Sequence, residues 1–114
     1  GPMMGKAVSN ADVPVVKGTS GIVLIPEEES SRSEMTPCIR CAKCVSVCPL
    51  NLEPYLLMTL SEKGEFERAV AEGITDCMEC GSCSYCCPAH RPLLDYIRLG
   101  KSLAAKMARK QMVK

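Results

Sequence analysis

The sequence predicts a mainly α-helical domain preceded by a short β-hairpin segment. Three observations support this fold class. Nine cysteines include two runs with the same spacing, aliphatic residues recur at helical intervals after each run, and a valine- and isoleucine-rich segment surrounds a glycine-containing turn. We expect residues 1–34 to form the hairpin segment and a linker from a preceding domain, and residues 35–114 to form the helical domain.

The hairpin is expected within residues 13–25. Three valines in residues 13–16 precede the glycine-containing turn at 18–21, and four aliphatic residues follow at 22–25, so two short strands are predicted. A lone hairpin is marginal in water, so this segment should pack on the helical domain or belong to a region outside this sequence. Residues 27–32 should form a polar linker. Neither glycine-rich phosphate-binding pattern is present.

Three helices are predicted in the second region. Leucines recur every four residues over 52–60, Pro54 suits a first helical turn, and Gly64 can end the helix. A second, short helix should span residues 65–72, with Gly73 as its cap.

The last helix should begin near residue 91 or 92 and continue to about residue 110. Leu93, Leu94 and Ile97 should point inward. The chain has one Phe, three Tyr and no Trp, so its apolar core is poor. We therefore expect folding to be linked to the insertion of metal, as in other small metal-bound domains.

The two cysteine runs share the pattern C-x2-C-x2-C-x3-C-P. The first contains Cys38, Cys41, Cys44 and Cys48, and the second contains Cys77, Cys80, Cys83 and Cys87. This pattern is the bacterial ferredoxin signature for a pair of [4Fe-4S] clusters. Thiolates separated by two residues let a short loop wrap three corners of an iron-sulfur cube, with backbone amides free to point at the sulfurs. The chain should therefore relay single electrons, and we expect no catalytic residue.

The fourth cysteine of each run is expected to bind the cluster of the other run. A following proline biases the cysteine away from helix, so the chain turns away from its own cube. In two-cluster ferredoxins this cysteine ligates the other cluster. The expected ligands are Cys38, Cys41, Cys44 and Cys87 for the first cluster, and Cys77, Cys80, Cys83 and Cys48 for the second.

Several neighbouring residues have plainer interpretations. Cys86 is left over and is expected to be a small buried hydrophobic residue, and His90 is expected to lie on the surface. Arg40 and Lys43 are either exposed charges or, like the amides near Gly81 and Ser82, groups that stabilise a reduced cluster.

Composition argues against other uses of these cysteines. A disulfide framework needs an oxidising compartment, but the first 20 residues lack the continuous apolar stretch of a secretory signal. Two zinc sites would not need the x3 spacing or the Cys-Pro steps. The formal charge is +1, and two oxidised clusters of about −2 each would make the loaded chain acidic, so no nucleic-acid partner is expected.

Several stretches of the chain resemble the C subunit of the Rnf electron-transport complex. They are residues 38–45, 76–81, 84–85 and 92–98 around the motifs, and residues 1–5 and 14–21 upstream. The similarity covers nearly the whole chain. One departure is Cys86, because that family has valine or another small apolar residue at this position.

The resemblance implies a function as part of a larger complex. That complex couples electron flow between reduced ferredoxin and NAD to sodium or proton movement, and its other subunits include a ferredoxin-like one. The C subunit is peripheral on the cytoplasmic face of the bacterial cell membrane, which agrees with the lack of any stretch of 18 apolar residues here. The family's FMN and NADH sites lie in a larger N-terminal region, so this chain should relay electrons without oxidising NADH.

Two other classes of protein remain open. The long helical spacer between Cys48 and Cys77 favours a helical ferredoxin domain, and such domains also occur in succinate dehydrogenase-like and heterodisulfide reductase-like proteins. The third class is a zinc-stapled interaction module, which would be colourless.

The last 24 residues hold seven basic and one acidic side chain. They form either a solvated helix face or a dock for an acidic electron-transfer partner or anionic lipid.

Overall fold

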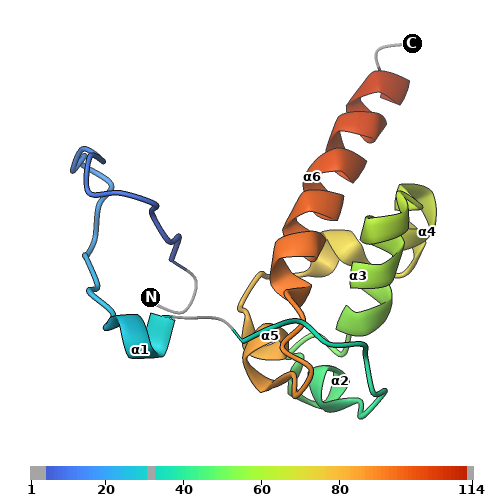
Figure 1. The fold of residues 1–114 in the computed structure, drawn as a ribbon. Helices are drawn as coiled ribbons and strands as arrows, with labels where there is room; N and C mark the ends of the chain where they lie inside the picture. Colours follow the sequence, from blue (N-terminus) through green and yellow to red (C-terminus); the bar gives the residue numbers. More distant parts are fainter. Residues whose placement is uncertain (1–4, 31–32, 113–114) are drawn as a thin grey trace.

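The computed structural model describes residues 5–30 and 33–112, and this part of the chain is mainly helical, as predicted. Figure 1 shows a compact group of helices with the N-terminal segment looping out beside it. The elements are α1 (Glu27–Ser30), α2 (Lys43–Val47), α3 (Pro54–Lys63), α4 (Phe66–Ala71), the 3-10 helix η2 (Ile74–Asp76), α5 (Ser82–Cys86) and α6 (Leu93–Met112). The ends of the two expected domains at residues 1–4 and 113–114, and residues 31–32 near their boundary, lie outside the described residues.

The predicted β-hairpin is not present in the described N-terminal segment. A turn is present at residues 16–19, two residues before the predicted turn at 18–21. The amide of Thr19 donates to the carbonyl of Val16 over 2.9 Å, and the Thr19 hydroxyl accepts from the Val16 amide over 3.1 Å. No strand is assigned over residues 13–25, and the apolar side chains there are exposed, Leu24 by 91%. The turn needs only local contacts, whereas strands need a paired backbone edge and a surface to cover their apolar face.

The polar linker predicted at 27–32 is helical in part. α1 forms one short turn there, and the amides of Glu29 and Ser30 both donate to the carbonyl of Pro26 over 3.0 Å. A proline at this point suits a helix start because it has no amide proton to satisfy.

The helices α3 and α4 lie where the sequence predicts them. Pro54 occupies the first position of α3, and Gly64 ends it in the left-handed conformation with a φ of 78°. The amide of Gly64 caps the last carbonyls of the helix. α4 is followed by Gly73, which is also left-handed, and η2 then leads the chain into the second cysteine run.

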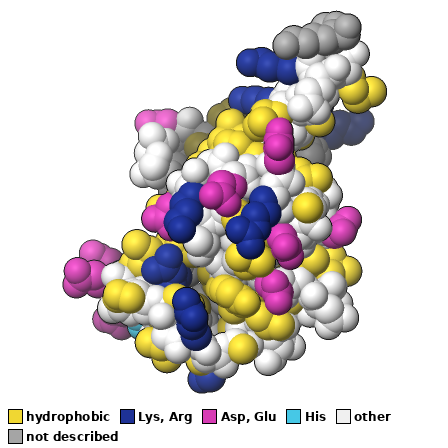
Figure 2. All heavy atoms as spheres, turned by 90° about the vertical axis from the view of Figure 1, so that its right-hand side faces the viewer, with side chains coloured by type: hydrophobic (Ala, Val, Ile, Leu, Met, Phe, Trp, Pro, Cys, Tyr) yellow, Lys and Arg dark blue, Asp and Glu magenta, His cyan; other side chains and the backbone are white. Residues whose placement is uncertain are grey.

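The longest helix, α6, begins at Leu93 and extends two residues past the predicted end. Leu93 and Ile97 are buried as expected, while Leu94 is only half-buried. Ala104 is the last buried residue, and the helix then projects beyond α3 and α4 (Figure 1). Basic side chains gather on this projecting end (Figure 2), which includes Arg109 and Lys110 in its last turn.

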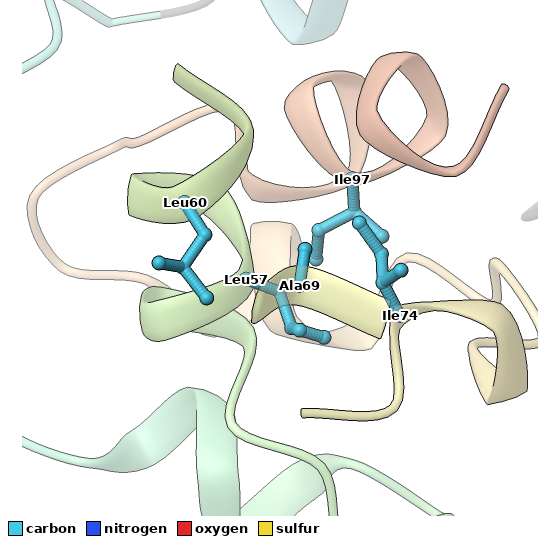
Figure 3. Packing of buried hydrophobic residues seen from close by; sticks show 5 residues of the cluster. All are labelled: Leu57, Leu60, Ala69, Ile74 and Ile97. Carbon is cyan, nitrogen blue, oxygen red and sulfur yellow. The ribbon is translucent and has the colours of Figure 1, made fainter. Parts of the chain in front are cut away.

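The apolar core lies where α3, α4, η2 and α6 meet. Figure 3 shows its five buried side chains, which are Leu57, Leu60, Ala69, Ile74 and Ile97. Fully burying one large aliphatic side chain stabilises a fold by about 1.5–3 kcal/mol. A second buried cluster, which consists of Cys44, Met58, Cys83 and Leu93, lies against the cysteine loops. Both clusters are small for a chain of this length, so bound metal would add to the stability of the domain.

The helical domain consists of two similar halves. The shift in numbering that carries Cys38 onto Cys77 also carries α2 onto α5 and the first residue of α3 onto the first residue of α6. The same shift in numbering also pairs three residues of positive φ in the first half with three in the second. These pairs are Arg40 and Glu79, Ala42 and Gly81, and Asn51 and His90. The repeat therefore includes the backbone bends of the loops as well as the cysteine spacing.

The two halves meet where α3 crosses α6. Ser61 and Gly100 face each other at this crossing, and they are equivalent positions of the repeat. A Cβ atom on Gly100 would lie 2.8 Å from the Cβ of Ser61 and 2.9 Å from the Cδ1 of Ile74. Ser61 is buried, but its hydroxyl donates to the carbonyl of Leu57 in its own helix over 2.8 Å. The crossing is therefore close and leaves no polar group unsatisfied.

Candidate metal centres

Each cysteine loop is bent so that a backbone amide points back at a sulfur. The amide of Arg40 donates to the Sγ of Cys38, and the amide of Glu79 donates to the Sγ of Cys77, both over 3.4 Å. Both donor residues adopt positive φ, which non-glycine residues seldom do. The loops thus accept backbone strain to place amides against sulfur, and such hydrogen bonds tune the potential of iron-sulfur clusters.

The fourth cysteine of each run ends a short helix in extended conformation. Cys48 caps α2 with φ −69° and ψ 118°, and Cys87 caps α5 with φ −66° and ψ 116°. This is the effect predicted for a residue that precedes proline. The Sγ of Cys48 accepts a hydrogen bond from the amide of Leu52 over 3.4 Å, so this sulfur too is met by a backbone donor.

A hollow in the domain brings together cysteines from both runs. Four thiols line it, from Cys48 of the first run and Cys77, Cys80 and Cys83 of the second. These are the four residues that the sequence predicts for the second cluster. Apolar side chains, including Leu52, Leu57, Met78, Leu94 and Ile97, form the rest of the wall. Four sulfur donors in apolar surroundings fit the ligand set of a [4Fe-4S] cluster.

The other predicted set is more open to solvent. Cys44 is buried and shares an apolar cluster with Cys87, which joins the two runs a second time. Cys38 and Cys41 are exposed. The structure thus brings Cys44 and Cys87 together and leaves Cys38 and Cys41 at the surface.

Burial sets the protonation of the inner thiols. Removal from water raises the pKa of Cys44 and Cys77, and it raises the pKa of Cys83 to about 11. Cys80 differs, since hydrogen bonding with the amide and the hydroxyl of Ser82 lowers the pKa of its thiol. Thiols bind metal as thiolates, so loading these sites must release protons from the buried cysteines.

The neighbouring residues singled out in the sequence lie mainly at the surface. His90 is exposed, as expected, and so are the side chains of Arg40 and Lys43. Cys86 is half-buried rather than fully buried, and the equivalent residue of the first half, Val47, is exposed. Its Sγ contacts the carbonyl of Cys83 at 3.5 Å.

Two contacts from α6 to the second loop have no local sequence signal. The Nζ of Lys101 donates to the carbonyl of Cys77 over 2.7 Å, and Arg98 pairs with Glu79 over 3.2 Å. A third contact joins α5 to α6, where the hydroxyl of Ser84 accepts from the amide of Leu94 over 2.9 Å. Lys101 stands out in the sequence only when the two halves are compared. The equivalent residue of the first half, Glu62, carries the opposite charge.

Over residues 5–30 and 33–112, no three His, Cys, Asp or Glu side chains converge closely enough to hold a single metal ion.

Comparison with known proteins agrees with this chemistry. A family model described as "4Fe-4S dicluster domain" matches residues 30–88. The chain therefore belongs to the 4Fe-4S dicluster domain family, and its cysteines are those of an iron-sulfur protein.

The curated relatives that the chain matches are C subunits of ion-translocating oxidoreductase complexes. The chain is 45% identical over 103 residues to the C subunit of the proton-translocating ferredoxin:NAD(+) oxidoreductase complex of Clostridium ljungdahlii, covering 90% of this chain and 22% of the relative. It is 43% identical over 111 residues to the C subunit of the ion-translocating oxidoreductase complex of Rhodobacter capsulatus, covering 96% and 21%. The C subunit of the Na(+)-translocating ferredoxin:NAD(+) oxidoreductase complex of Acetobacterium woodii is 42% identical over 101 residues, covering 89% and 23%.

The resemblance to the Rnf C subunit is thus confirmed. The chain spans about a fifth of the length of these relatives. No helix of the described residues is both long and apolar enough to cross a bilayer.

Proposed function

We propose that this chain relays electrons through two [4Fe-4S] clusters as part of the C subunit of an Rnf-type ion-translocating oxidoreductase. The observation that carries the proposal is the apolar hollow in which Cys48 of the first run meets three cysteines of the second. A [4Fe-4S] cluster, when bound, takes up and gives off one electron at a time. The chain supplies the ligands, the surroundings and the distance between the two centres.

The proposed ligands follow the crossed pattern. The second cluster would be held by Cys77, Cys80, Cys83 and Cys48. The first cluster would be held by Cys38, Cys41, Cys44 and Cys87. The crossing ties each half of the repeat to the other, and a fixed short separation lets an electron pass without rearrangement of the chain. The amides of Arg40, Leu52 and Glu79 would donate to the bound sulfurs.

The relatives support a place in a larger assembly. Their names describe a complex that connects ferredoxin with NAD(+) and moves protons or sodium ions. For this chain we propose a peripheral position on the cytoplasmic face of the membrane, with a ferredoxin-like subunit among its partners. FMN and NADH would bind in the longer region that the relatives possess, so this part of the protein would act only as the relay.

The N-terminal segment fits the same proposal. Residues 1–34 would belong with a preceding domain, and the helical ferredoxin domain would begin at residue 35. The apolar residues Val15, Ile22 and Leu24 flank a formed turn and are exposed. A sheet edge in that preceding domain would supply the backbone partner that the segment lacks.

The test is anaerobic reconstitution of the chain with iron and sulfide, followed by metal analysis and EPR of the reduced sample. Two cubes correspond to about eight irons per chain and to a brown protein with the EPR signals of reduced [4Fe-4S] clusters. A folded, colourless protein that holds zinc in place of iron would overturn the proposal.

A further inference from the structure

Lys101 reaches from α6 to the second cysteine loop. Its Nζ donates a hydrogen bond of 2.7 Å to the backbone carbonyl of Cys77, and the residue is half-buried there. A carbonyl carries no net charge, so this contact fixes the ammonium in place without neutralising it.

The acidic side chain of the second loop does not cancel this charge. Glu79 pairs with Arg98, whose Nε lies 3.2 Å from the Glu79 carboxylate, and both side chains are about one-third exposed. Arg98 offsets part of the Glu79 charge, and Asp76, the other acidic residue beside Cys77, is exposed to solvent. Lys101 is the half-buried cation that is fixed at the Cys77 carbonyl.

The equivalent position in the first half carries the opposite charge. The repeat places Glu62 of α3 where α6 has Lys101, and Glu62 lies 3.9 Å from the Nη2 of Arg91. Arg91 also donates to the carbonyl of Thr36, two residues before Cys38, over 3.3 Å. The Arg91–Glu62 pair adds no net charge beside the first loop, whose own basic residues Arg40 and Lys43 are exposed to solvent. The two halves thus differ in charge at the positions of Glu62 and Lys101, although their backbones agree.

Burial differs between the halves in the other direction. Cys38 and Cys41 are exposed, whereas Cys77 and Cys80 are half-buried. Burial disfavours the added negative charge of a reduced cluster, so burial alone would give the second cluster the lower reduction potential. A cation fixed next to that cluster acts against this difference.

We infer that Lys101 is a positioning residue that raises the reduction potential of the cluster held by Cys48, Cys77, Cys80 and Cys83. Reduction adds one negative charge to that cluster, and the fixed ammonium stabilises the added charge more than water would. The difference between the reduction potentials of the two clusters becomes smaller, so that electron transfer between them is less unfavourable in the uphill direction. The inference rests on the proposed function, because it requires both clusters.

The experiment compares Lys101→Met and Lys101→Gln with the unchanged chain after anaerobic reconstitution. Iron is counted first, and the reduction of each cluster is then followed by EPR during a redox titration. Both substitutions remove the charge, but glutamine keeps a donor for the Cys77 carbonyl. We expect one midpoint potential to fall and the other to stay. At a fixed potential the reduced-to-oxidised ratio of that cluster should drop about tenfold, which corresponds to about 59 mV for one electron.

Two further variants separate charge from structure. Lys101→Arg keeps the charge and should keep the potential, and Lys110→Met removes a cation from the exposed end of the same helix and should change neither cluster. If the unchanged chain binds no iron, the proposed function fails. If all variants hold about eight irons and neither Lys101→Met nor Lys101→Gln lowers a potential, the role of Lys101 is refuted while the relay stands. Loss of iron in Lys101→Gln as well as in Lys101→Met would also refute it, because the residue would then be needed for folding.

Discussion

Gly100 of α6 lies directly against Ser61 of α3, and the two residues are equivalent positions of the internal repeat. The approach is close because Gly100 has no side chain, and a Cβ there would also meet Ile74 in the core. Helix pairs seldom approach this closely unless one of them offers a small residue at the crossing.

Gly100→Ala should therefore destabilise the domain although alanine favours helices. Overpacking of a well-packed site costs about 1–3 kcal/mol, which exceeds the gain of about 1 kcal/mol in helix propensity. Denaturant unfolding of the reconstituted protein measures the difference. Ser102→Ala on the exposed side of α6 is the matched control and should have little effect. Adding Ser61→Gly should recover part of the loss, and strict additivity of the two changes would contradict the contact.

Cys86→Ser and Cys87→Ser should behave differently although the residues are adjacent. Cys86 corresponds to Val47 of the other half, whereas Cys87 corresponds to Cys48 and shares an apolar cluster with Cys44. Cys86→Ser should keep about eight irons per chain, and Cys87→Ser should lose or convert one cluster. Iron analysis and EPR decide the matter, and the reverse result would show that Cys86 is the ligand.

Cys48→Ser tests the crossing of the ligands. Cys48 belongs to the first run by sequence but lines the hollow of Cys77, Cys80 and Cys83. The variant should lose the same cluster as Cys80→Ser and leave the same residual EPR spectrum. Cys41→Ser is the comparison for the other cluster. A Cys48→Ser spectrum that matched that of Cys41→Ser would mean that each run binds its own cube.

The metal-free protein, kept reduced, should become less stable in alkali. Burial raises the pKa of Cys83 from 9.0 to about 11, and the pKa of Cys44 and Cys77 shifts in the same direction. A raised pKa favours the neutral thiol in the fold, so this contribution to stability is complete below pH 9 and is lost as the pH rises toward 11. Denaturant unfolding at pH 8 and pH 10 measures it. Cys83→Ala should weaken the pH dependence, and an equal slope in both proteins would contradict the assignment.

Much of the fold could be predicted because it depends on local rules. Pro54 and Gly64 mark the ends of α3, and the residue before each Cys-Pro proline is extended as expected. These features follow from the conformations that proline and glycine allow. The N-terminal turn lies at residues 16–19 rather than at the predicted 18–21, because Thr19 closes it with both its amide and its hydroxyl.

The remaining features depend on contacts between distant parts of the chain. Strands at 13–25 require a backbone partner, which the apolar pattern implies but does not supply. Lys101 contacts Cys77 only because α6 packs beside the second loop, and no local motif marks it.

The mixed origin of the four thiols in the hollow has a consequence for the ancestry of the domain. If the two halves arose by duplication, a single ancestral half would have carried three sulfurs for its own cube and one for a neighbour's. Such a peptide could complete its centres only by pairing with a second copy, each lending the other a corner ligand. Fusion of the two copies would have turned a symmetric dimer into one chain, after which opposite charges such as Glu62 and Lys101 were free to diverge.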